Sequence, residues 1–107
     1  METYTNNKAG TLYLLKSRTG IYKLGYTRRE LSRRVSSANR LCNDDFMVMR
    51  TRVVQQPSKV EKSMLYDIWN NTDESDVGTE FFTIRSDGYT EGEIISLFEV
   101  GHEQRLD

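Results

Sequence analysis

The chain has 107 residues, of which 36% are hydrophobic and 29% charged, a composition that suits one small domain with a single modest core. The longest apolar run, Leu12 to Leu15, is too short to span a membrane, and the polar N-terminus is unlike a secretion signal. A single cysteine, Cys42, excludes an internal disulfide, so we expect a cytoplasmic or otherwise intracellular protein.

Charge is divided unevenly along the chain. Residues 1–60 carry twelve Lys or Arg against four Asp or Glu, whereas residues 61–107 carry three against twelve. This division predicts either a basic face for a polyanion or two halves whose surfaces pair with each other. The acidic second half is also a candidate surface for a basic protein partner.

The first predicted element is a β-hairpin with strands over residues 11–16 and 21–26. Gly20 would end its three-residue loop in the left-handed conformation, and the resulting register sets Tyr13 opposite Gly25. One face of the hairpin then carries Tyr13, Leu15, Ile21, Lys23 and Gly25. The other face is apolar enough to be a core face and carries Leu12, Leu14, Tyr22, Leu24 and Tyr26.

The rest of the chain alternates between helical and extended patterns. In order, it predicts a helix at residues 29–41, a strand at 46–54, a helix opening at 57, an acidic loop at 70–78, an extended segment at 80–84 and a helix after Thr90. Ser58 and Glu61 have capping-box spacing, as do Thr90 and Glu93. The expected fold is α/β, with a small, three-stranded, mainly antiparallel sheet and about three helices over residues 10–100. Residues 1–9 are expected to form a flexible leader and residues 101–107 a tail.

Five features occur in a recognisable order. The segment 10–15 (GTLYLL) contains Tyr13, and the segment 23–27 (KLGYT) begins with Lys23 and contains Gly25. Arg34 follows on the first predicted helix, and Glu61 lies on the second. The last feature is a Glu-aromatic-Phe triplet made of Glu80, Phe81 and Phe82.

This set resembles the motifs of the GIY-YIG endonuclease superfamily. The triplet resembles the signature of one branch, which comprises small phage-encoded and meiotic proteins usually labelled as a DNA-binding domain. The resemblance implies a metal-dependent nuclease that hydrolyses DNA with weak sequence preference, acting in a cytoplasm such as that of a phage-infected host. Lys23 departs from the family pattern, because many members have a tyrosine there.

The resemblance also implies a role for each site residue. Glu61 would hold one Mg²⁺ or Mn²⁺ ion, since such ions prefer carboxylate oxygens. Arg34 would stabilise the scissile phosphate. Tyr13 would position or deprotonate the attacking water, and Lys23 would favour the ionised phenol or contact the phosphate. Gly25, opposite Tyr13, would leave room for a phosphate to approach.

Each of these residues has an alternative structural interpretation. Tyr13 is also consistent with a half-buried strand aromatic, and Lys23 with a solvated strand residue. Arg33 competes with Arg34 for the phosphate contact. The capping box would engage Glu61 at the start of its helix. The triplet at residues 80–82 would close the core beside a surface carboxylate.

Binding to nucleic acid, most plausibly DNA, is expected through basic side chains of the hairpin and first helix. These are Lys16, Arg18, Arg28, Arg29, Arg33 and Arg40. Together they would engage phosphates and read few bases. Two alternatives stay open: a catalytically silent nucleic-acid-binding module, and a protein-interaction or inhibitor module that uses the acidic half.

Overall fold

The computed structural model describes residues 9–100, and Ala9 precedes its first strand. Apart from Ala9, the predicted leader and tail lie outside the described residues. Strands β1 (Gly10–Ser17) and β2 (Tyr22–Thr27) form the predicted hairpin, with Tyr13 opposite Gly25. The Ser17 amide donates to the Ile21 carbonyl over 2.7 Å, and Gly20 has a φ of 99°. The hairpin prediction is confirmed.

The sheet has five strands in the order β3-β1-β2-β5-β4, and every neighbouring pair is antiparallel. The added strands are β3 (Phe46–Val54), β4 (Asp73–Ser75) and β5 (Gly78–Thr83). The α/β class is confirmed, but the prediction of three strands is wrong. The sequence missed β4 because its three residues are polar and partly or fully exposed, so they lack the apolar alternation of a buried strand. The segment read as an acidic loop therefore contains half of a short hairpin.

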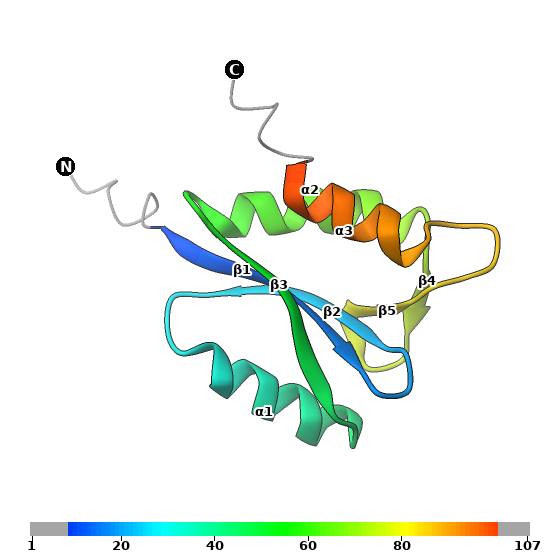
Figure 1. Cartoon of the computed structure of the whole chain (residues 1–107), viewed down its shortest axis with the longest axis horizontal. Helices are drawn as coiled ribbons and strands as arrows, with labels where there is room; N and C mark the ends of the chain where they lie inside the picture. The colour runs from blue at the N-terminus through cyan, green and yellow to red at the C-terminus, as the bar shows by residue number, and fades with distance from the viewer. Residues whose placement is uncertain (1–8, 101–107) are drawn as a thin grey trace.

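Helices cover both faces of the sheet (Figure 1). Helix α1 (Leu31–Cys42) lies against one face, and α2 (Pro57–Trp69) and α3 (Glu91–Val100) lie against the other. The core under α2 and α3 contains the predicted apolar face of the hairpin, namely Leu12, Leu14, Tyr22 and Leu24. The core under α1 contains Tyr13, Leu15, Ala38, Phe46 and Phe81. Both faces of the central hairpin are therefore buried.

The helix ends follow their local chemistry. Glu30 keeps an extended backbone (φ −71°, ψ 128°), so α1 starts two residues later than predicted. Helix α2 starts with Pro57 after Gln56, and no side chain caps it. Helix α3 follows the predicted capping box, in which the Glu93 carboxylate accepts from the Thr90 amide over 2.8 Å and the Thr90 hydroxyl from the Glu93 amide over 3.2 Å. Among residues 9–100, none of the helices has the length and apolar character needed to cross a membrane.

Candidate active site

Tyr13 and Lys23 form a buried pair on the α1 face of the hairpin. Their side chains are 1% and 7% exposed, and the Lys23 ammonium donates to the Tyr13 phenol oxygen over 2.9 Å. The ammonium also lies 5.2 Å from the centre of the Tyr13 ring. Because lysine is the donor, the phenol keeps its own proton for another acceptor. Neither residue is solvated, so the alternative interpretation of Lys23 as a solvated strand residue is wrong.

Gly25 lies directly beneath the Tyr13 side chain. A Cβ atom added at Gly25 would come within 2.5 Å of the Tyr13 phenol oxygen. The space beside this glycine is therefore filled by the tyrosine, and the expectation that it admits a phosphate is wrong. The glycine instead permits the tyrosine to lie across β2 towards the end of the sheet.

Glu61 reaches the same region from α2. It is 6% exposed and sits one turn inside the helix, where it caps nothing, so the capping-box interpretation is wrong. Burial, and then the neighbouring Glu80 carboxylate, raise the pKa of Glu61 to about 7, whereas Lys23 lowers it. Glu61 is therefore a buried carboxyl group that faces a second carboxyl group.

Glu80 belongs to β5 and stands just before the two positions at which β5 pairs with β2. Its carboxylate lies 3.6 Å from the Lys23 ammonium, and its charge raises the pKa of Glu61. Phe81 and Phe82 are both buried, as the structural interpretation expects. Phe82 stacks on Tyr22 at 5.5 Å between ring centres, and Phe81 meets Phe46 edge-on at 6.0 Å. These rings anchor the backbone that carries Glu80.

A cavity of about 380 Å³ unites these side chains where β2 and β5 diverge. Its walls include Tyr13, Glu61, Glu80 and Arg34. Arg34 comes from the first turn of α1, so the cavity draws on both strands of the hairpin, on β5, and on α1 and α2 from opposite faces of the sheet. Such an arrangement places two carboxyl groups and several arginine side chains around one cavity.

Arg33 does not line this cavity. It lines two neighbouring cavities, one with Arg29 and Glu30 and the other, of about 310 Å³, with Arg29 and Arg34. The guanidinium Nε of Arg33 lies 4.0 Å from the Glu30 carboxylate, and both side chains are mostly exposed. The structure therefore brings Arg34 next to Tyr13 and Glu61, and it places Arg33 farther along the same groove.

The predicted basic residues divide into two groups. Arg28, Arg29, Arg33 and Arg34 line the cavities near the start of α1, and Arg28 also lies 5.7 Å from the centre of the Tyr26 ring. Lys16 instead binds Glu91 on the α3 side over 2.7 Å. Arg40 lies in the last turn of α1, away from these cavities. The expectation that the whole set shares one side is thus wrong for Lys16, because its even-numbered strand position points to the opposite face.

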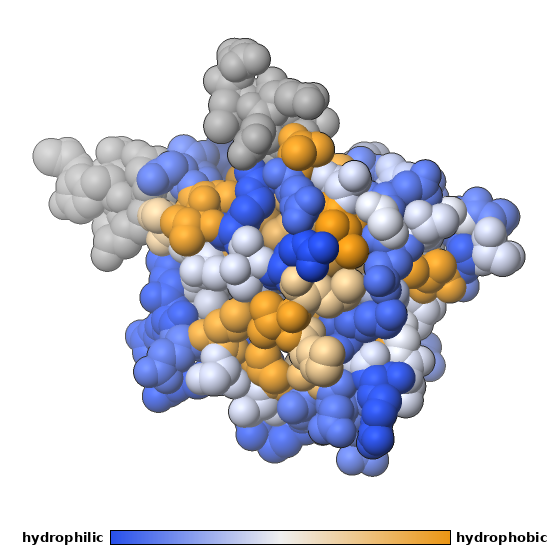
Figure 2. All heavy atoms as spheres, in the orientation of Figure 1, coloured by the Kyte–Doolittle hydropathy of each residue, from blue (hydrophilic) through white to orange (hydrophobic). Residues whose placement is uncertain are grey.

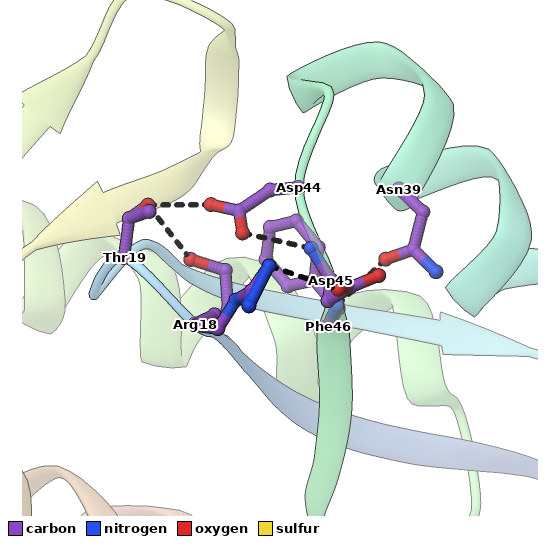
Figure 3. Close-up of polar contacts among 7 residues, drawn as sticks. Arg18, Thr19, Asn39, Asp44, Asp45 and Phe46 are labelled. Carbon is purple, nitrogen blue, oxygen red and sulfur yellow. Dashed lines mark hydrogen bonds and ion pairs between the residues drawn. The ribbon is translucent and has the colours of Figure 1, made fainter.

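Arg18 belongs to a polar cluster that joins the hairpin loop to the turn between α1 and β3 (Figure 3). The Arg18 amide donates to the Asp45 carbonyl over 2.9 Å, and the Thr19 hydroxyl donates to Asp44. The bond from Thr19 and that from the Asp45 amide lower the pKa of Asp44. Asn39 accepts from the Phe46 amide over 2.6 Å. This cluster fixes the C-terminal end of α1 and the start of β3 against the hairpin loop.

Sequence reasoning missed the position of Glu80 at the site. The signal was present, since a carboxylate precedes two core aromatics, but nothing local reveals that β5 pairs with β2. Among residues 9–100, no group of three or more His, Cys, Asp or Glu side chains could hold a metal ion. The two facing carboxyl groups are nevertheless suitable oxygen donors for a hard cation, which often binds through one or two carboxylates and water.

Comparison with protein-family models, curated proteins and solved structures found no match for this chain.

Proposed function

We propose that this protein is a metal-dependent nuclease of the GIY-YIG type that hydrolyses DNA phosphodiesters with weak sequence preference. The observation that carries the proposal is the convergence of Tyr13, Arg34 and Glu61 on one cavity. They come from β1, α1 and α2, and the resemblance assigns each of them a part in this chemistry.

The cavity contains the groups that phosphodiester hydrolysis needs. Arg34 offers a planar pair of donors to the scissile phosphate. Tyr13, with its oxygen held by Lys23, has its proton free to orient the attacking water molecule. Glu61 would hold the Mg²⁺ or Mn²⁺ ion, which when bound supplies positive charge to stabilise the phosphate oxygens.

Nucleic acid fits the surroundings of the cavity better than a small phosphate ester does. A second cavity of about 310 Å³ shares Arg29 and Arg34 with the first and adds Arg33. Successive basic side chains along a groove suit the repeated charges of a phosphate backbone. They make few base-specific contacts of the kind that a helix in the major groove provides, in keeping with weak sequence preference.

Incubation with supercoiled plasmid tests the proposal. We expect nicking in Mg²⁺ or Mn²⁺, none in EDTA, and a loss of at least about a hundredfold in rate for Glu61→Gln, because the amide is a poor substitute for a carboxylate ligand. Glu74→Gln is the matched control, since Glu74 is an exposed carboxylate on β4, and it should nick like the wild type. Equal nicking by Glu61→Gln and the wild type would show that Glu61 takes no part in the hydrolysis.

A silent nucleic-acid-binding module is the second candidate. The observation that favours it is the pKa of Glu61 of about 7, because a carboxyl group that is half protonated at neutral pH is a weakened cation ligand. This module would retard DNA in a gel with the wild-type protein and with Glu61→Gln alike, without any metal-dependent product.

A further inference from the structure

Glu80 occupies a position that a purely structural role does not explain. Its carboxylate shares the walls of the cavity with Glu61 and Tyr13 and is within 3.6 Å of the Lys23 ammonium. Phe81 and Phe82 of the same strand pack in the core and are almost completely buried, whereas the Glu80 side chain is 44% exposed. The Glu80 side chain is thus partly buried beside the Lys23 ammonium and partly exposed to the cavity.

Two carboxyl groups, those of Glu61 and Glu80, line the cavity, and arginine side chains line it too. Lys23 and then Lys62 lower the pKa of Glu61, and the Lys23 ammonium lies 3.6 Å from the Glu80 carboxylate. That ammonium also donates to Tyr13 and lies over two aromatic rings, so it is confined to one side of the pair. A cation between two neighbouring carboxyl groups favours the ionised form of both.

The chemistry of these two carboxyl groups suits a divalent cation. Mg²⁺ and Mn²⁺ bind carboxylate oxygens, keep several waters, and are commonly held by one or two carboxylates together with phosphate oxygens. Lys23 would orient Glu80 by holding one side of its carboxylate, as residues behind a metal site often do.

We propose that Glu80 is a second carboxylate ligand, with Glu61, of the divalent cation in this cavity. This inference rests on the proposed function, which needs only Glu61 to bind the ion. It assigns to Glu80 a role in binding the cation, in addition to the core-closing role of the two aromatic residues beside it.

Mn²⁺ titration by calorimetry, without nucleic acid and at a pH above the pKa of Glu61, tests the inference. We expect Glu61→Gln and Glu80→Gln each to weaken Mn²⁺ binding by roughly tenfold or more. Glu80→Asp should weaken it similarly, since it keeps the charge but withdraws the oxygens by one methylene. Glu74→Gln, the exposed control on β4, should bind Mn²⁺ like the wild type.

Comparing Glu80→Asp with Glu80→Gln separates direct coordination of the ion from attraction by the negative charge of Glu80 at a distance. Wild-type affinity in Glu80→Asp, together with weak binding by Glu80→Gln, would mean that only the charge matters and would overturn the inference. Unchanged affinity in Glu80→Gln, or no Mn²⁺ binding by the wild type, would also overturn it. Thermal unfolding of each variant without Mn²⁺ verifies that it folds, which the partial exposure of Glu80 leads us to expect.

The outcome is independent of that of the nuclease assay. Cation binding that needs both carboxylates, but no nicking of plasmid, would support the role of Glu80 and reject the nuclease. Nicking that needs Glu61, with Mn²⁺ affinity unaffected by Glu80→Gln, would support the nuclease and reject the role of Glu80.

Discussion

Glu61 places a carboxyl group in a buried position beside a second carboxyl group. Both the loss of water and the neighbouring negative charge oppose its ionisation, whereas Lys23 and then Lys62 favour it. A bound cation would reverse this balance, because it favours the ionised form. The residue is therefore a sensitive reporter of what occupies the cavity.

This environment predicts that the stability of the metal-free protein depends on pH. Folding raises the pKa of Glu61 from 4.5 to about 7, so the folded state binds its proton more tightly than the unfolded chain does. The contribution is fully present below pH 4.5 and is lost as pH rises through about 7, a change on the order of 3 kcal/mol. Urea unfolding in EDTA at a series of pH values would measure it.

Two comparisons isolate Glu61 in that experiment. Glu61→Gln should abolish the loss of unfolding free energy between pH 4.5 and about 7, and Glu74→Gln should retain that loss. Asp44 and Glu91 do not interfere, because hydrogen bonds from Thr19 and Lys16 respectively lower their pKa values, and their contributions are lost only at lower pH. Parallel plots of unfolding free energy against pH for the wild type and Glu61→Gln would contradict a raised pKa at Glu61.

At the scale of elements, α1 presents its arginines unequally to the groove. Arg33 and Arg34 lie in the first turn, beside the cavities, whereas Arg40 lies in the last turn. Arg40 comes seven residues after Arg33, which is a rise of about 10 Å along the helix axis. Position along the helix, and not charge alone, should decide which arginine binds DNA.

Arginine substitutions on α1 test that expectation. In the Glu61→Gln background, which prevents cleavage, Arg33→Ala and Arg34→Ala should each weaken binding to a labelled duplex. Each should also reduce the slope of log affinity against log salt by about one. Fluorescence anisotropy at several salt concentrations would measure both effects.

Arg40→Ala is the matched control, because it removes the same charge from the same helix. It should leave affinity and slope nearly unchanged. Equal losses for Arg33→Ala and Arg40→Ala would mean that DNA contacts the length of α1 and is not guided by the groove.

At the scale of the whole molecule, the uneven charge of the two halves is used partly within the fold. Ion pairs link Lys16 to Glu91, Lys23 to Glu80 and Arg50 to Glu99, and each joins the basic half to the acidic half. The arginines at the start of α1 instead line cavities. Both interpretations of the charge division therefore describe part of the molecule.

The apolar surface is also divided between core and exterior. Figure 2 shows hydrophobic atoms on the face where β3 crosses the front of Figure 1. Met47, Val48 and Val53 of this edge strand are 71%, 43% and 75% exposed, whereas Leu14 in the neighbouring strand is fully buried. Hydrophobic character alone therefore does not identify the core of this protein.

Paired substitutions would separate the two environments. Leu14→Ala should lower the free energy of unfolding by about 3 kcal/mol, because it leaves a cavity between the sheet and the helices α2 and α3. Val53→Ala should cost less than about 1 kcal/mol, since the side chain is mostly in water already. Chemical denaturation would measure both, and similar costs would show that β3 is more buried than the structure indicates.

Much of this fold could be predicted because its signals are local. The register of the first hairpin follows from Gly20 and from strand alternation, and the start of α3 follows from Thr90 and Glu93. The strand β4 could not be predicted, since three polar residues carry no periodic signal and pair only because β5 is already anchored by its aromatics. At the site, Tyr13 and Lys23 were predicted to share a face, and they do.

The resemblance to the GIY-YIG motifs selected Arg34 and Glu61, and the sequence by itself determined the α/β class and the hairpin that aligns Tyr13 with Lys23. These depend on turn chemistry and on the periods of strands and helices, which involve neighbours in the chain. Only the tertiary structure decided that Glu61 is buried and does not cap its helix, and that Glu80 faces it. Those facts depend on how α2 packs and how β5 pairs with β2, and such contacts between distant segments arise from the packing of the whole chain and leave no mark in local pattern.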